Sequence, residues 1–272
     1  MTPQAALPYL AGLVIACWLV ATLGYLPQVA KRVRFPLGIT FFVLGWLLIV
    51  GYMGWMWMAL QRPPMRTQGE TRLWYALMLP AIGLVIQWRW KKNTLAAMPI
   101  LIMLMASVFI IITALNPDSF DKSLMPALQS PWFVPHVLVY MASYAIFGLT
   151  AVISLWTLGR EIFIRDGGCD RAAVDMQRLV NIGFPLLTTG LIFGALWAKV
   201  AWGHYWSWDP KETWAFLSWA VYLIYLHLKT YTRLSSRMHL VVLIGAVLVI
   251  FGCWFGVNSL PTSQQSMHSY MN

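Results

Sequence analysis

The chain is dominated by apolar runs that are each long enough to cross a lipid bilayer and that are separated by short polar segments. A helix of about 20 apolar residues spans the roughly 30 Å hydrocarbon core and satisfies its own backbone hydrogen bonds there. The runs therefore predict an all-α fold, a polytopic transmembrane helix bundle of about eight spans. The expected spans cover residues 9–30, 36–60, 73–88, 95–115, 136–159, 179–200, 211–227 and 240–257.

Composition supports the membrane assignment and limits the domain organisation. Of the 272 residues, 60% are hydrophobic and 10% are charged, whereas soluble domains carry about 25% charged residues. Spans with such short connections leave no room for a separate soluble domain, so residues 1–272 are expected to form a single integral membrane domain. Residues 1–116 would hold the four N-terminal spans, and residues 130–272 a second half with a tryptophan-rich loop, 197–214. No internal repeat is apparent in the sequence.

The formal net charge of +10 comes from basic residues that are scattered through the loops and do not form a nucleic-acid-binding patch. The loops after the first, third, fifth and seventh expected spans hold 13 of the 19 Lys and Arg residues, and the opposite side holds the other 6. The positive-inside rule makes the richer side cytoplasmic. Both termini and the tryptophan-rich loop are then expected on the outer, periplasmic side. The expected partners include the lipid bilayer and no nucleic acid.

The segment 202–210 combines closely spaced aromatic rings with a polar, turn-forming sequence that cannot itself span a bilayer. An interfacial aromatic belt needs only a few rings on several helices, so this density favours a flat apolar shelf for a flat ligand such as a porphyrin. Part of the segment also has a simpler structural interpretation. Asp209, Pro210 and Glu212 match the N-cap, first-turn proline and capping box of a helix start.

The five histidines are the residues best suited to hold a metal-containing ligand. His136 at the start of the fifth span and His268 in the C-terminal tail are both expected on the outer side, near the aromatic segment. If they met there, they would form a bis-imidazole site for haem iron; each could equally be an ordinary interfacial histidine. His227 lies deep in the seventh span, about 27 Å along the helix from Asp209, where an ionisable residue is a functional candidate.

The sequence WGHYWSWDPKETW, residues 202–214, resembles the tryptophan-rich (WWD) signature of haem-handling cytochrome c assembly proteins. The ending Pro-Lys-Glu-Thr-Trp is similar to the CcsA/ResC branch of the system II maturation pathway. Residues 225–227, 256–258 and 268–270 also resemble that family, and the resemblance covers about residues 130–272. The first four spans are similar to the family only in hydropathy and size.

The resemblance implies a membrane protein that works with a CcsB/ResB-type subunit in a holocytochrome c synthase complex. Such a pair carries haem b outward and presents it for thioether attachment to apocytochrome c at CxxCH motifs. By position, His136 and His268 would be the outer axial ligands, and His227 one ligand of a second haem site within the membrane. The shelf would consist of Trp202, Gly203, Trp206, Trp208 and Asp209. The resemblance favours the bacterial inner membrane over the thylakoid membrane.

Other functions stay open at this point. A haem carrier or exporter without ligase activity would need the same residues. A non-haem transporter is disfavoured because no Asp, Glu, Lys or Arg falls well inside an expected span, and an electron-transfer haem subunit is disfavoured because only His227 lies within one. His204 matches a motif position with no defined role. Haem propionates could pair with basic side chains on the outer side, and the candidates are Lys199, Lys211, Arg62 and Arg66.

Overall fold

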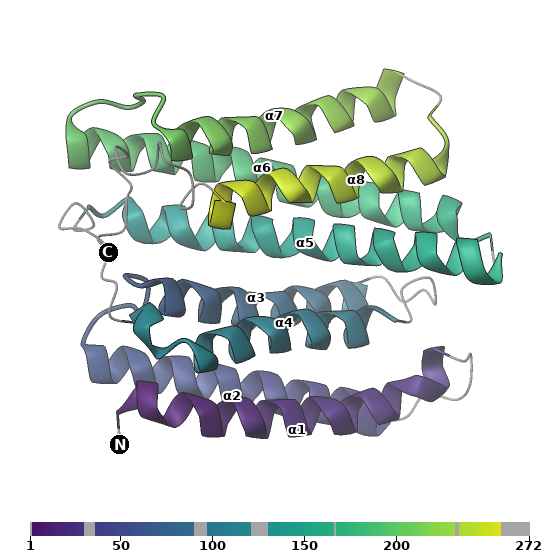
Figure 1. Cartoon of the computed structure of the whole chain (residues 1–272), viewed down its shortest axis with the longest axis horizontal. Helices are drawn as coiled ribbons and strands as arrows, with labels where there is room; N and C mark the ends of the chain where they lie inside the picture. The colour runs from purple at the N-terminus through teal and green to yellow at the C-terminus, as the bar shows by residue number, and fades with distance from the viewer. Residues whose placement is uncertain are drawn as a thin grey trace. The chain divides into compact units, whose positions relative to one another are not determined.

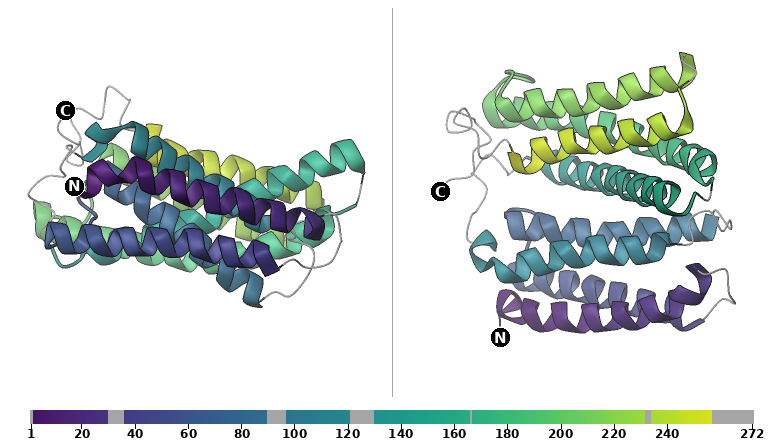
Figure 2. Two further views of the ribbon diagram at one scale, coloured as in Figure 1. Left: turned by 90° about the horizontal axis from the view of Figure 1, so that it is seen from below. Right: turned by 45° about the vertical axis from the view of Figure 1, so that its right-hand side comes forward.

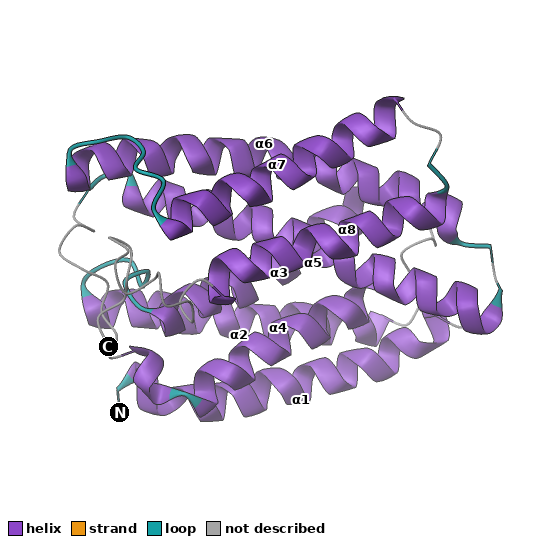
Figure 3. Ribbon diagram, turned by 45° about the horizontal axis from the view of Figure 1, so that its top comes forward, coloured by secondary structure: helices purple, strands orange, loops and turns teal. Residues whose placement is uncertain are grey.

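The expected all-α fold is confirmed by a computed structural model that describes residues 2–29, 36–89, 97–120, 130–165, 167–231 and 234–256. These residues contain eight α-helices and no β-strand (Figures 1 and 3). The chain divides into two compact units, which are Met1–Ser123 (unit 1) and Leu124–Asn272 (unit 2).

Each unit contains four of the α-helices. The described part of each unit ends in a short helical turn that is not α-helical. Unit 1 consists of α1 (Pro3–Val29), α2 (Pro36–Leu60), α3 (Gln68–Arg89), α4 (Met98–Leu115) and the 3₁₀ turn η2 (Pro117–Phe120). Unit 2 consists of α5 (Phe133–Ile164), α6 (Cys169–Trp202), α7 (Pro210–Tyr231), α8 (Ser236–Phe251) and the π-helical turn η4 (Gly252–Gly256). The sequence therefore predicted the helices correctly in number and order.

Six of the described helices are long and apolar enough to cross a membrane, namely α1, α2, α4, α5, α6 and α8. The other two, α3 and α7, have 22 residues each, and helices of that length extend about 33 Å. Neither of them meets the apolarity of a membrane-crossing helix over its described residues. The six apolar helices indicate a multi-pass membrane protein.

The charged junction between the fifth and sixth expected spans is shorter than the sequence suggested. Helix α5 continues to Ile164, and α6 begins at Cys169, ten residues before the expected start of that span. The chain reverses direction around Arg165 (φ 53°) and Gly167 (φ 65°), both in the left-handed region. Apolar patterning marks only the part of a helix that lies in lipid, so the charged first turns of α6 were assigned wrongly to a loop.

Small residues on α6 allow α5 to approach it closely. A side chain added at Gly183 would collide with the ring of Phe147 on α5, and one added at Gly190 would lie 2.4 Å from the ring of Tyr140. The Ser143 hydroxyl donates a hydrogen bond to the Gly183 carbonyl at 3.0 Å. In a membrane, helices associate through this kind of close packing and through interhelical hydrogen bonds. These contacts fix the register of α5 against α6.

The two units pack most of their helices in the same pairs, which the sequence did not reveal. In unit 1, α1 packs against α2 and α4, and α3 packs against α4; in unit 2, α5 packs against α6 and α8, and α7 packs against α8. Figure 2 shows the helices of each unit running alongside one another. Unit 1 also places a ring of its first helix over a glycine of its second, since Trp18 lies against Gly45. Unit 2 also packs α6 against α8, whereas the described part of unit 1 has no comparable packing of α2 against α4, so the two units share these pairs and differ in that one.

Candidate functional site

Five segments of unit 2 meet at the end of the bundle where α6 turns into α7. They are the start of α5, the end of α6, the loop 203–209 (called the Trp loop below), the start of α7 and the end of α8. Figure 3 shows the Trp loop in teal between α6 and α7. The Tyr144 hydroxyl donates to Cys253 Sγ at 3.8 Å, and this thiol contacts the Lys211 carbonyl at 3.9 Å. The end of α8 is thereby joined to both α5 and α7.

His136 occupies the first turn of α5 and is held against α6 by a hydrogen bond. Its Nδ1 lies 2.9 Å from the Gly190 carbonyl. A carbonyl oxygen can only accept, so the proton must be on Nδ1, and the lone pair of the neutral imidazole is then on Nε2. Metal-binding histidines are commonly oriented in this way, with the other ring nitrogen donating to a backbone carbonyl. The hydrogen bond to Gly190 therefore favours the tautomer of His136 in which the lone pair is on Nε2.

The ring of His136 is part of an aromatic cluster at the end of α6. It stacks on Trp197 with ring centroids 5.7 Å apart and an interplanar angle of 27°. Trp197 also contacts Phe133 at 5.5 Å and Trp202, the last residue of α6, at 4.9 Å. The structure therefore brings two predicted site residues, His136 and Trp202, to the same cluster. Trp197 joins them and was not among the predicted site residues.

A further run of rings leads from the Trp loop along α7. Trp206 meets Trp208 edge to face at 5.7 Å, and Trp208 meets Phe216 on α7 at the same distance. Phe216 stacks on Trp219, whose indole N–H donates to the Thr188 hydroxyl of α6 at 3.0 Å. The predicted shelf residues 206 and 208 thus belong to an aromatic surface that is attached to both α6 and α7.

Backbone conformation explains how the Trp loop presents its rings. Gly203 ends α6 in the left-handed region, at φ 85°, and its carbonyl accepts from Lys199 Nζ at 2.7 Å. Trp208 also has a positive φ, 59°, and 63% of its surface is exposed. A bulky residue in this region is strained and is a reason to suspect a functional requirement. The predicted tryptophan-rich loop 197–214 is shorter in the structure, since residues 197–202 belong to α6 and residues 210–214 to α7.

Asp209 and Glu212 form the capping box that the sequence predicted. Asp209 Oδ1 accepts from the Lys211 N–H at 2.9 Å, and Glu212 Oε2 accepts from the Asp209 N–H at 3.3 Å. Glu212 Oε2 also accepts from the N–H and hydroxyl of Ser207, at 2.7 and 3.1 Å. The structural interpretation of Asp209 is therefore confirmed, since its buried carboxylate caps the first turn of α7.

The remaining predicted ligands lie elsewhere. His227 is exposed on α7, toward the end opposite the Trp loop, and its Nδ1 lies 2.8 Å from the Leu223 carbonyl. His239, which was not a predicted ligand, is buried at the start of α8 beside Tyr225. His268 lies outside the described residues, so its predicted meeting with His136 stays a prediction. The described chain ends at Gly256, in the turn that packs near the start of α7.

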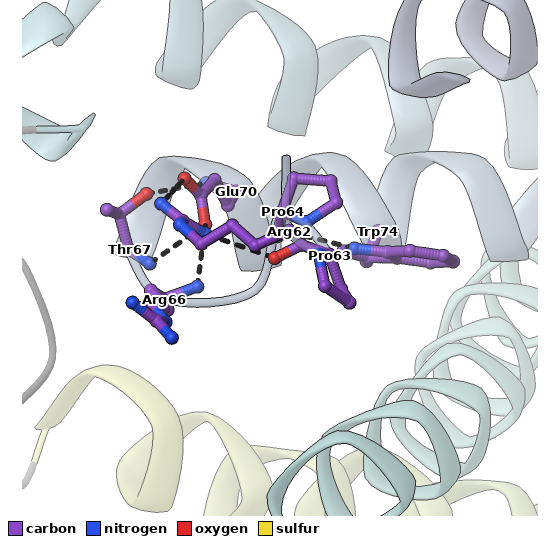
Figure 4. A network of polar contacts seen from close by, with 7 residues as sticks. All are labelled: Arg62, Pro63, Pro64, Arg66, Thr67, Glu70 and Trp74. Atoms are coloured by element: carbon purple, nitrogen blue, oxygen red, sulfur yellow. Dashed lines mark hydrogen bonds and ion pairs between the residues drawn. The ribbon is translucent and has the colours of Figure 1, made fainter. Parts of the chain in front are cut away.

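Two of the basic side chains proposed for propionates have partners within their own unit. Arg62 forms a bidentate ion pair with Glu70, at 2.8 and 3.0 Å (Figure 4). Lys199 binds the Gly203 carbonyl and lies 5.4 Å from the ring of Tyr205. Both interactions serve the local loop structure, so the geometry gives neither residue a specific role toward a propionate.

The sequence reasoning missed the residues that position His136, although one signal was visible. Gly190 and Gly194 form a G-x-x-x-G pair, which is a common mark of close helix packing in membranes. A side chain added at Gly194 would lie 2.9 Å from Cε1 of His136. Together with Trp197, this pair forms the α6 surface that receives the imidazole.

Comparisons with known proteins agree on one family. The profile of the family described as "Cytochrome C assembly protein" matches residues 7–264. A cytochrome c biogenesis protein CcsA of Mesostigma viride is 35% identical over 54% of this chain and 57% of its own length, and one of Synechococcus sp. (strain CC9902) is 36% identical over 57% and 60%. One of Helianthus annuus is 30% identical over 82% of both chains. The match thus spans little more than half the length of the first two relatives.

Proposed function

Because this chain belongs to the cytochrome C assembly protein family, we propose that it is the haem-handling membrane subunit of a cytochrome c maturation complex. The family assignment supports the expected role in cytochrome c biogenesis. We infer haem b as the cargo, a CcsB/ResB-type protein as the membrane partner, and apocytochrome c with CxxCH motifs as the client. We place it in the bacterial inner membrane, with the thylakoid membrane as the alternative for relatives from cyanobacteria and plants.

The orientation of His136 supports this proposal most directly. The hydrogen bond from Nδ1 to the Gly190 carbonyl and the stacking on Trp197 hold the imidazole with its lone pair on Nε2. Nε2 would serve as one axial ligand of haem iron. The second ligand would be His268, in the segment that follows Gly256. Trp202, Gly203, Trp206, Trp208 and Asp209 would form or support the apolar shelf under one porphyrin face.

The residues of the site provide binding, orientation and exclusion of water. Thioether formation adds the S–H of a client cysteine across a vinyl C=C of haem, so neither an oxidant nor a protein nucleophile is required. The ring surface would hold one face of the porphyrin, and the imidazoles would fix the position of the iron, so that a vinyl group can face the docked client. Correct placement of two reactants is by itself a substantial source of rate.

We assign His227 to a separate haem site within the membrane. Its imidazole is exposed on α7, and its Nδ1 lies 2.8 Å from the Leu223 carbonyl, which again puts the lone pair on Nε2. An exposed imidazole at membrane depth is costly unless another group covers it. The second ligand of this site would come from the partner subunit, and haem would pass from here to the outer site.

The His136→Gly protein, purified from membranes with its partner, is expected to lose most of the haem bound at the outer site. Added imidazole is expected to restore the absorption spectrum of bis-imidazole haem, because it can occupy the space left by the ring. Leu138→Gly is the control, since it places the same flexible residue in the same helical turn. Equal haem content in wild-type and His136→Gly proteins would remove His136 from the ligand set.

The same preparation distinguishes a ligase subunit from a haem carrier. Mixed with reduced apocytochrome c and the partner, the wild-type complex is expected to yield cytochrome with covalently bound haem. A carrier without ligase activity would instead release haem that organic solvent extracts from the client.

The Trp208→Gly substitution is expected to lower haem retention while it leaves the stability of the protein almost unchanged. Glycine adopts φ 59° without the steric cost of about 1–2 kcal/mol that a bulky residue bears. The protein should therefore melt within a few degrees of wild type while it loses the edge-to-face contacts of the exposed indole with Trp206 and Phe216. A haem content as high as that of wild type would exclude Trp208 from the shelf.

A further inference from the structure

The loops that join the second and third helices of the two units are built alike. Loop 61–67 of unit 1 and the Trp loop of unit 2 have the same length. Each begins with a residue at positive φ, Gln61 at 50° and Gly203 at 85°. Each ends in an N-cap residue that is followed by a glutamate at the third helical position. The unit 1 loop is therefore an internal reference for the Trp loop.

In unit 1 every oxygen of the capping glutamate has a partner, as Figure 4 shows. Glu70 Oε2 accepts from the N–H of Arg66 at 2.6 Å and of Thr67 at 3.3 Å. The Arg62 guanidinium spans both oxygens, at 3.0 Å from Oε2 and 2.8 Å from Oε1. Glu70 is only 2% exposed, so this guanidinium neutralises a buried charge.

In unit 2 the same carboxylate is only half satisfied. Glu212 is 7% exposed, and its Oε2 accepts from the Ser207 N–H, the Ser207 hydroxyl and the Asp209 N–H. Its Oε1 is buried and has no hydrogen-bond partner in the described part of the chain. The Asp209 N–H bond, 3.3 Å, equals that of Thr67 in unit 1. The two capping boxes thus differ chiefly in what faces Oε1.

The difference has a clear origin in the sequence. Arg62 stands eight residues before Glu70, and the residue eight before Glu212 is His204. His204 does not replace the guanidinium, because its Nδ1 is itself buried without a hydrogen-bond partner among the described residues. Beside the Trp loop, the buried Oε1 of Glu212 therefore has no counterpart, among the described residues, of the guanidinium that binds Glu70.

We propose that Glu212 Oε1 receives a guanidinium from another protein, at the place that Arg62 occupies beside Glu70. A carboxylate in a buried position requires a cation or strong donor, and guanidinium is the group that matches its geometry. Glu212 also binds Ser207 and the Asp209 N–H, which flank the strained Trp208, so a guanidinium bound here would affect the backbone that presents the indole. The Trp loop is then completed by an arginine of its protein partner. The proposal does not depend on haem ligation.

The first test uses the purified full-length protein in detergent and N-acetyl-arginine methylamide as the probe. We expect a saturable rise of about 2–4 °C in the unfolding temperature, and none with the uncharged citrulline analogue. Glu212→Gln should abolish the response, because the amide carries no charge to attract a guanidinium. Equal responses of wild-type and Glu212→Gln proteins, or no response of either, would overturn the proposal. Stabilisation by acetate instead would identify an anion site and would also overturn it.

The second test supplies the guanidinium within the chain. His204→Arg should place it as Arg62 is placed in unit 1, so the variant should melt about 2–4 °C higher than wild type and no longer respond to the probe. It should also bind the protein partner at least about tenfold more weakly, since the internal arginine competes. His204→Gln is the control, because it changes the same residue without supplying a guanidinium. A His204→Arg protein with unaltered stability and unaltered partner binding would contradict the proposal.

Discussion

Gly194→Ala is expected to reduce the haem content of the purified complex by about tenfold to 100-fold, the range seen when groups that orient a metal ligand are removed. The added methyl group would lie 2.9 Å from Cε1 and 3.0 Å from Nδ1 of His136. The imidazole cannot simply rotate away, because it donates to the Gly190 carbonyl and stacks on Trp197. It must therefore give up the orientation that presents Nε2.

Two control experiments test whether the loss of haem acts through the imidazole of His136. Gly245→Ala in α8 adds the same methyl group where nothing lies within 4 Å, so it should leave the haem content unchanged. In the His136→Gly background with added imidazole, Gly194→Ala should reduce the haem content much less, because a free imidazole can move away from the added methyl group. If Gly194→Ala and Gly245→Ala proteins retain equal amounts of haem, the contact between α6 and His136 does not position a ligand.

Helix identity was predictable because it depends on local sequence. Uninterrupted apolar runs fix a helix in a membrane whatever it packs against, and each of the eight expected spans overlaps an observed helix. Helix ends that lie outside the membrane do not depend on apolar runs. The first turns of α6 are polar and held in part by local pairs such as Asp175 with Arg178, 2.9 Å apart, and apolar patterning cannot detect them.

The site was predictable only in part, because its geometry depends on contacts between helices. The motif 202–214 identified the Trp loop, and the capping box at Asp209 followed from local sequence. The placement of His136 on Trp197 requires the register of α5 against α6, which the glycines of α6 determine. The similarity of the two units, and with it the comparison of Glu212 with Glu70, arises from helix packing and loop geometry. Neither leaves a recognisable repeat in the sequence.

Arg62→Met is expected to be among the most destabilising single substitutions in unit 1. It removes the guanidinium from Glu70, which is 2% exposed, and leaves a buried carboxylate without its cation. Breaking a buried ion pair in this way costs about 3–5 kcal/mol, which corresponds to a fall of roughly 6–20 °C in the unfolding temperature of a chain of this size. Thermal unfolding of the full-length protein in detergent measures the change.

The double variant Arg62→Met/Glu70→Gln should recover much of this loss, because the buried charge is then removed together with its partner. Arg237→Met is the control. The Arg237 side chain is 67% exposed, and its partner Glu161 is less buried than Glu70, so the change should leave the unfolding temperature almost unaltered. The result also decides between two roles for Arg62. If Arg62→Met lowered haem content and left the unfolding temperature unchanged, the guanidinium would serve a propionate; a fall in stability instead assigns it to the loop that Glu70 organises.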